Sequence, residues 1–304
     1  MTEETMEKTF QVASPARLEL ANICGSVEVH AGEAGVIQVN AVKRTESGDA
    51  GRTEIEMTQA SDGTVVVRTR FPEAGWTWLF GSHPCAVDYV VRAPRLCALR
   101  LRGVSNTLDV RGFAGECAVD MVSGEIELRD LNGDLRLRTV SGDISGERLS
   151  GKLEFKTVSG DLTLRESGLT SVQSNAVSGD VSLETGLAEG PYAFDSVSGD
   201  VRLTLPPATR CTAELAGISG DLSTAFPVSG YSHSSGRHSV TIWGGGVKVS
   251  LKSVSGDLSL ESSGPLPAGS DQNPAASAEA RRAVLGGIER GELSVEEALS
   301  KLKG

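Results

Sequence analysis

Aromatic residues and cysteines are scarce in this chain. Trp, Tyr and Phe make up 4% of its 304 residues, whereas glycine occurs 36 times. This balance favours many tight turns around thin aliphatic layers over one bulky aromatic core. The five cysteines are odd in number and are never spaced Cys-x-x-Cys, which argues against a disulfide framework and against a zinc knuckle. We expect reduced thiols, as in a cytoplasmic protein.

Long apolar runs and an excess of basic charge are also missing. No window approaches 18 continuous apolar residues, and the N-terminus has no basic segment followed by an apolar one. We therefore expect no signal peptide, no transmembrane segment and no direct membrane insertion, and a cytoplasmic location. The net charge of −11 and the pI near 5.0 make nucleic acid an unfavourable partner, because phosphates are bound by basic surfaces.

The chain is rich in a nine-residue repeat. Glycines recur without a gap at positions 115, 124, 133, 142, 151 and 160. The template reads Gly, a polar residue, apolar residues at positions 3, 5 and 8, and Ser or Asn at position 9, and the copy from Gly142 departs from it with Gly146 at position 5. Apolar residues two apart face one side of a strand, and template positions 8-9-1-2 resemble a turn in which Gly accepts a positive φ. One nonamer therefore predicts one short strand and one corner.

Alternate copies carry the corner sequence Val-Ser-Gly-Asp or Val-Ser-Gly-Glu, so two nonamers make one 18-residue coil. Later corners are 19 to 21 residues apart, and the 36 residues from Ser219 to Ser255 are interpreted as two coils with a degenerate middle corner. The predicted structural turn residues are Gly124, Gly142, Asp143, Gly160, Asp161, Gly179, Asp180, Gly199, Asp200, Gly220, Asp221, Gly256 and Asp257.

A fixed period of this kind predicts an all-β chain, folded as a β-solenoid of about 18-residue coils, because no coil buries its apolar face alone. An antiparallel meander of hairpins is the alternative, but independent hairpins have no reason to keep an unbroken phase. In the solenoid we expect six side chains to be buried in one interior ladder: Leu128, Leu137, Phe155, Leu164, Leu183 and Leu203.

Composition divides the chain into four regions: an aperiodic β region with early coils and a cap at residues 1–103, regular repeats at 104–261, a Ser/Pro/Gly linker at 262–276, and a helical hairpin at 277–304. The hairpin has two short apolar stripes, Leu285 with Ile288 and Leu299 with Leu302. Because these stripes are too small to fold alone, we expect the hairpin to dock a protein partner or a second copy of the chain.

The segment "WTWLF" places Trp76, Trp78 and Phe80 on one face of a strand. Such a cluster either covers the open end of the solenoid or forms an exposed contact for a partner or a membrane. The sequence leaves both interpretations open.

The recurrent Val-Ser-Gly-Asp corners, preceded by "AVDYVVRAPRLCALRLRGVSNTLDV" at residues 86–110, resemble the bacterial Toastrack domain, often labelled "putative adhesin". The resemblance covers about residues 10–262. The C-terminal "IERGELSVEEALSKLK" is similar to the SHOCT-like helical hairpin that accompanies such domains. The resemblance implies a non-enzymatic assembly or sensing module of a cell-envelope stress system. Close relatives often carry membrane segments, and this chain departs from them on that point.

The corner carboxylates, together with Glu125, form the one constellation with possible chemistry. Stacked coils would bring them to about 4.7–4.9 Å, where a cation could relieve their repulsion. The calcium-binding nonapeptide, however, needs Gly-Gly-x-Gly-x-Asp, so solvated turn Asp is the preferred interpretation. His30 and His83 are isolated, and His233 and His238 lie in "GYSHSSGRHS", a loop composition. We expect no catalytic residue, no cofactor and no metal.

These observations favour a non-enzymatic scaffold or interaction protein. A surface adhesin or carbohydrate-binding protein is one alternative, and a bactofilin-like polymer-forming solenoid is another. A polysaccharide-cleaving β-helix is the enzyme alternative, but it would need a clustered acid–base pair instead of an evenly spaced row of carboxylates.

Overall fold

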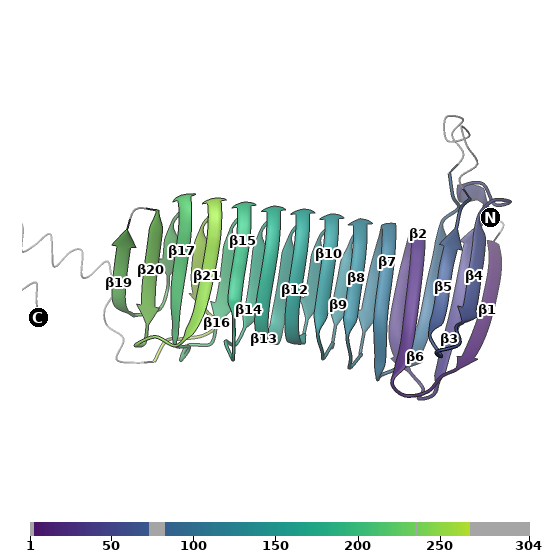
Figure 1. Ribbon diagram of the computed structural model, residues 1–304, viewed down its shortest axis with the longest axis horizontal. Coiled ribbons are helices and arrows are strands. Elements are labelled where there is room, and N and C mark those ends of the chain that lie inside the picture. The colour runs from purple at the N-terminus through teal and green to yellow at the C-terminus, as the bar shows by residue number, and fades with distance from the viewer. Residues whose placement is uncertain (1–2, 73–82, 235, 268–304) are drawn as a thin grey trace, which may run out of the picture.

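The computed structural model describes residues 3–72, 83–234 and 236–267. Within these ranges the chain is all-β: 22 strands form one continuous sheet, and a three-residue 3-10 turn, η1 (Thr45–Ser47), is the one helical element. The strands lie side by side along the long axis of an elongated molecule (Figure 1).

The central part of the molecule is a parallel sheet wound around a single core. Its strands are β7 (Cys97–Arg111), β8 (Cys117–Ser123), β9 (Ile126–Arg129), β10 (Leu135–Ser141), β11 (Ile144–Glu147), β12 (Ser150–Ser159), β13 (Leu162–Ser178), β14 (Val181–Thr185), β15 (Tyr192–Ser198) and β16 (Val201–Leu205). Leu135 pairs with Cys117 on one side and with Leu153 on the other, an offset of 18 residues each way. We name the side containing β8, β10, β12 and β15 wall A, and the side containing β9, β11, β14 and β16 wall B.

Inward side chains from both walls fill one hydrophobic core. The six predicted interior residues are all buried, with at most 1% of each side chain exposed, which confirms that part of the prediction. They form two rows instead of one ladder: Leu137 pairs with Phe155 in wall A, whereas Leu164, Leu183 and Leu203 follow one another in wall B.

The two corners of each coil differ in backbone conformation. The Val-Ser-Gly corners lead from wall A to wall B, and the strand keeps its alternation of inward and outward residues as far as the valine. At the opposite corners, which we name return corners, Gly112, Asp130 and Arg148 have φ values of 86°, 54° and 54°. These left-handed residues break the alternation, so the next residues turn inward and are buried: Phe113, Leu131 and Leu149.

At the N-terminal end, spatial order departs from sequence order. The strands are β1 (Glu3–Gln11), β2 (Ala16–Gly32), β3 (Val36–Arg44), β4 (Glu54–Gln59), β5 (Val65–Arg70) and β6 (Val87–Pro94). β2 lies between β7 on one side and β5 with β6 on the other, in parallel with all three. β1 pairs with β3, β3 with β6, and β4 with β5, each antiparallel.

The C-terminal end shows the same departure. Its strands are β17 (Cys211–Ser219), β18 (Leu222–Thr224), β19 (Val228–Ser234), β20 (Arg237–Ile242), β21 (Val247–Ser255) and β22 (Leu258–Ser262). Ser255 pairs with both Ser198 and Ser219, so the last coil is inserted between its two predecessors. The 36 residues between Ser219 and Ser255 are therefore not two stacked coils, because they contain β18 and an antiparallel hairpin, β19–β20, that extends wall A beyond β17.

The predicted fold class, a regular solenoid of about 18-residue coils with a C-terminal α-hairpin, is therefore wrong as stated. The described residues contain no α-helix, and a parallel core carries additional antiparallel strands at both ends. In the repetitive part, the nine-residue period predicts how many residues separate the paired positions of neighbouring strands. It gives no information on how strands outside the repeat pair. The predicted hairpin at 277–304 and residues 268–276 of the predicted linker lie outside the described residues.

Candidate interaction surface

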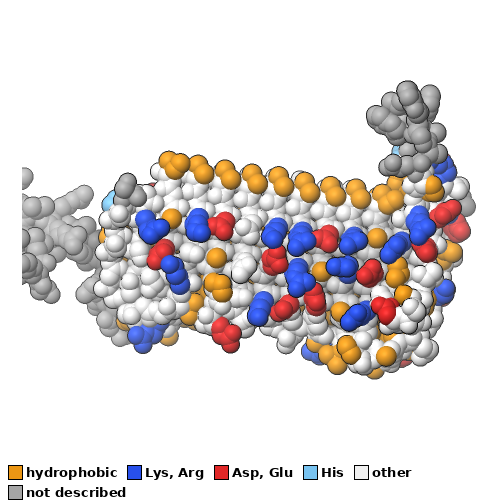
Figure 2. All heavy atoms as spheres, viewed as in Figure 1, with side chains coloured by type: hydrophobic (Ala, Val, Ile, Leu, Met, Phe, Trp, Pro, Cys, Tyr) orange, Lys and Arg blue, Asp and Glu red, His pale blue; other side chains and the backbone are white. Residues whose placement is uncertain are grey.

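An exposed row of β-branched apolar residues runs along one long edge of the stack. The valines of the Val-Ser-Gly corners, and Val104 at the equivalent position before Ser105 and Asn106, are each 46–51% exposed. Ile218, which occupies the same position in its coil, is 87% exposed. Figure 2 shows this continuous hydrophobic row along the upper edge. We name it the valine ridge; in spatial order it consists of Val104, Val122, Val140, Val158, Val177, Val197, Val254 and Ile218.

Strand alternation explains why these valines face solvent. In β10 the side chains of Leu135, Leu137 and Thr139 are buried, so the next residue, Val140, points outward. Template positions 3 and 5 share one parity and position 8 has the other. The sequence therefore contained the signal for an exposed valine, although grouping the three apolar positions together hid it.

The corner glycines allow successive coils to approach closely. Gly160 and Gly179 have φ values of 143° and 130°, which favour glycine. A Cβ built on Gly179 would lie 2.2 Å from the carbonyl oxygen of Gly160. The predicted turn glycines thus stack directly on one another, and a larger residue would push adjacent corners apart.

The corner carboxylates form a hydrogen-bonded row beside the ridge. Asp143 Oδ1 accepts a hydrogen bond from the backbone N–H of Asp161 at 3.0 Å, and Asp161 Oδ1 accepts one from Asp180 at 2.8 Å. The same contact repeats through the inserted coil, at 2.8–2.9 Å. We name this row the aspartate ladder; it consists of Asp143, Asp161, Asp180, Asp200, Asp257 and Asp221. Each of these carboxylates except the last, Asp221, thus accepts a hydrogen bond from the backbone of the neighbouring coil.

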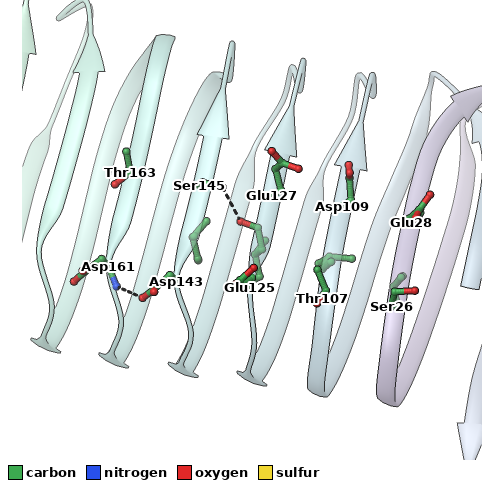
Figure 3. Close-up of a pocket in the computed structure, with 14 residues that line it drawn as sticks. Ser26, Glu28, Thr107, Asp109, Glu125, Glu127, Asp143, Ser145, Asp161 and Thr163 are labelled. Carbon is green, nitrogen blue, oxygen red and sulfur yellow. Dashed lines mark hydrogen bonds between the residues drawn. The ribbon is translucent and has the colours of Figure 1, made fainter. Parts of the chain in front are cut away.

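A shallow acidic groove of about 550 Å³ lies on wall B next to the ladder (Figure 3). The carboxylates that line it are Glu28, Asp109, Glu125, Glu127, Asp143 and Asp161. Arg111 forms ion pairs with Asp109 and Glu127, and Arg129 pairs with Glu127. Among the described residues, no group of three or more His, Cys, Asp or Glu side chains could hold a metal ion.

On wall A, the ridge is flanked by side chains of mixed charge, visible as interleaved blue and red in Figure 2. Arg138 lies 3.9 Å from Asp120 and 3.7 Å from Glu154, and Lys156 lies 2.6 Å from Glu154. The hydrogen bond from Lys156 lowers the pKa of Glu154. The ridge therefore has two unlike flanks: an aspartate ladder on one side and largely neutralised charge on the other.

The five cysteines include two, Cys97 and Cys117, that belong to the buried core. All five are free, as predicted. Burial raises the pKa of both Cys97 and Cys117 to about 12, and a thiol in this state is a poor nucleophile.

Two predicted contact surfaces lie outside the described part of the chain. Trp76, Trp78 and Phe80 lie outside the described residues, as do Leu285, Ile288, Leu299 and Leu302. No helix in the described part of the chain is long and apolar enough to cross a membrane.

The histidine interpretation needs correction. His233 and His238 do not lie in a solvated loop, because they occupy facing positions on β19 and β20. The Ser/Gly-rich composition concealed a hairpin whose strands are held by pairing with β17.

The Toastrack DUF4097 family model matches residues 113–185 and 166–261, together a little under half of the chain. The crystal structure of a "putative adhesin" from Parabacteroides distasonis aligns with a TM-score of 0.52 at 11% identity, covering 84% of this chain and 97% of that one. A "putative adhesin" from Parabacteroides merdae gives the same TM-score and identity, with 84% and 96% covered. No curated protein matches the sequence significantly. The repetitive part of this chain is thus similar to the Toastrack family, and its fold is shared with these two structures.

Proposed function

We propose that the chain is a non-enzymatic interaction protein that binds another protein surface through the valine ridge. The observation that carries this proposal is the presence of a half-exposed β-branched residue at every Val-Ser-Gly corner. With on the order of 70 Å² of apolar surface exposed per residue, the ridge totals about 500–600 Å², the upper range for the largest apolar patch of a monomer, which is often functional.

The spacing of the ridge favours a second copy of the chain as its occupant. Ridge residues repeat at the inter-strand distance of about 4.7–4.9 Å. A helix repeats at about 5.4 Å per turn and the same-face residues of an extended strand at about 6.4–6.8 Å, so neither stays in step along the ridge. Two facing ridges would bury about 1,000–1,200 Å² in total, near the lower limit of a specific interface. We therefore expect a dimer that dissociates readily.

The unlike flanks favour one orientation of that dimer. Two residues before the ridge, wall A carries Arg138, Lys156 and Lys252, although Asp120 and Asp195 belong to the same row. A two-fold axis parallel to the stack places this row opposite the partner's aspartate ladder. A two-fold axis perpendicular to the stack, but still in the interface plane, brings the two ladders together, and like charges repel. The parallel arrangement is the one we propose.

The family-model match at residues 113–261 supports membership of the Toastrack family. From the resemblance we further infer a cytoplasmic assembly or sensing module of an envelope stress system. The ridge contact is proposed from the exposure of its residues. Docking of a partner or a second copy through residues 277–304, which lie outside the described part of the chain, stays a prediction. A reporter fused to the chain should be active on the cytoplasmic side of the membrane, and activity on the outer side would favour a surface adhesin instead.

Replacing three central ridge residues tests the proposed interface. Val140→Ser, Val158→Ser and Val177→Ser combined should shift the full-length chain from dimer to monomer in sedimentation equilibrium, because they remove the middle of the apolar contact. Val90→Ser is the matched control, since Val90 is 41% exposed but lies outside the ridge. A wild-type chain that stays monomeric at 100 μM or more excludes self-association, and a triple variant that associates like wild type excludes the ridge.

A further inference from the structure

Two histidines and a tyrosine converge on one face of the C-terminal hairpin. His233 on β19 is the register partner of His238 on β20, and Tyr231 lies two residues before His233, on the same face. The two Nδ1 atoms are 3.3 Å apart, and Tyr231 Oη lies 3.5 Å from His238 Nδ1. The ring centroids are 4.4 Å apart with planes at 66°. The rings therefore meet edge to face, with two ring nitrogens directed toward each other.

These separations match those between ligands of a tetrahedral metal ion. Two nitrogens at about 2.0–2.1 Å from a tetrahedral Zn²⁺ lie about 3.3–3.4 Å apart. The distance between the two Nδ1 atoms falls on this value, and the phenol oxygen stands at a similar separation from one of them. The donor set is two imidazole nitrogens and one oxygen, which suits Zn²⁺ and neighbouring divalent transition metals over Ca²⁺ or Mg²⁺.

We propose that His233, His238 and Tyr231 form a binding site for a divalent transition metal ion, Zn²⁺ above all. The third protein ligand of this site is the phenol oxygen of Tyr231, in place of a third His, Cys, Asp or Glu side chain. Tyr231 and His233 are exposed and His238 is half-buried, so water completes the coordination, and the site is an open one.

The fold prepares this site at little cost. β20 is held by pairing with β17 on one side and with β19 on the other, which fixes the Cα positions of both histidines. Arg237, the nearest basic residue in sequence, precedes His238 directly and so points to the opposite face of the strand. A direct Nδ1–H···Nδ1 hydrogen bond between two neutral imidazoles would also give 3.3 Å, but an exposed hydrogen bond contributes little against water.

The site lies on the two strands that extend wall A, and among the described residues β19 pairs with β20 alone. A bound ion would tie β19 to β20 and stabilise this end of the molecule, because a ligand that binds the folded state alone shifts the unfolding equilibrium. This role is independent of the valine ridge.

Titration of the untagged full-length chain with ZnCl₂ tests the proposal by isothermal calorimetry. We expect one ion per chain with a dissociation constant of 100 μM or lower, and a saturable rise in melting temperature. Co²⁺ should give the visible absorption of a four-coordinate nitrogen and oxygen site. His233→Ala and His238→Ala should each weaken binding at least tenfold, and the double variant should abolish it. Tyr231→Phe should weaken it several-fold.

The controls use the other two histidines of the chain, His30 and His83. His30→Ala and His83→Ala should bind Zn²⁺ like wild type. Since the ligands lie on an exposed face, the hairpin variants should keep the wild-type circular dichroism spectrum. Absence of stoichiometric binding, or binding that survives in the His233→Ala/His238→Ala double variant, overturns the proposal.

Discussion

The two corners of each coil carry the same template but hold its apolar residue in opposite environments. At the Val-Ser-Gly corners, Val122 and Val140 are half-exposed, whereas at the return corners Leu131 and Leu149 are buried. The difference comes from one backbone conformation, because Asp130 and Arg148 adopt the left-handed region directly before their leucines. No such residue precedes the valines. A single change of φ thus decides whether an apolar side chain builds the core or forms a surface.

The comparison also separates stability from recognition. Leucines at the return corners join a core that includes inward residues of both walls. The ridge valines are about half exposed and do not belong to that core, so we expect them to contribute less to folding than to association. Substitutions at the two corners should therefore move different measurements.

The largest expected difference is between Leu149→Asp and Val140→Asp. Leu149 is fully buried, so the first variant places an unpaired charge in the core and should lose several kcal/mol of unfolding free energy. Val140→Asp should stay within about 1 kcal/mol of wild type, as surface substitutions do. Urea denaturation followed by circular dichroism measures both.

If Leu149→Asp fails to fold, Leu149→Ala and Val140→Ala repeat the comparison more gently. The expected losses are about 2–5 kcal/mol for the leucine and under about 1 kcal/mol for the valine. Equal losses at the two corners would contradict the assignment of core and surface.

The second prediction concerns glycine stacking at the ridge corners. Gly179→Ala should destabilise by on the order of 3 kcal/mol, because its Cβ would meet the Gly160 carbonyl oxygen at 2.2 Å and its φ is 130°. Gly168→Ala is the matched control, since a Cβ there meets no heavy atom within 4 Å. Thermal unfolding should separate the two variants clearly, and similar melting temperatures would show that the corners can move apart.

Much of the central fold could be predicted from the sequence, whereas its ends could not. The unbroken nonamer phase correctly placed Leu137 and Phe155 in the interior, because a repeat reports its own offset directly. Order at the ends depends on pairing between segments that lack the template. For this reason the repeat period alone places Ser255 two coils beyond Ser219, whereas in the structure the two are direct neighbours.

The candidate sites divide in the same way, into features with a local sequence signature and features that depend on strand pairing. The turn role of Asp161 was predicted, because Gly-Asp corners have a local conformational signature. The facing of His233 and His238 depends on hairpin register, which a Ser/Gly-rich segment specifies weakly.

The third prediction tests the left-handed residue itself. Asp130 has a φ of 54°, a conformation that asparagine, aspartate and glycine tolerate and β-branched residues do not. Asp130→Val should cost about 1–2 kcal/mol, while Asp130→Gly should be close to neutral. Ser145→Val, on an exposed and extended position of β11, serves as the control and should not destabilise. If Asp130→Val melts like wild type, another feature directs Leu131 inward.

The smallest expected effect concerns the aspartate ladder. Asp161 Oδ1 accepts the N–H of Asp180 at 2.8 Å, and the side-chain carbonyl of asparagine can accept the same bond. Asp161→Asn should therefore change the unfolding free energy by no more than about 0.5 kcal/mol.

If the carboxylates act only as turn acceptors, millimolar Ca²⁺ should leave the melting temperatures of wild type and Asp161→Asn unchanged apart from screening. A calcium-binding ladder would behave differently: wild type would show a saturable rise in melting temperature, because the ion binds the folded state. Asp161→Asn, which lacks one charged ligand between Asp143 and Asp180, would lose much of that rise.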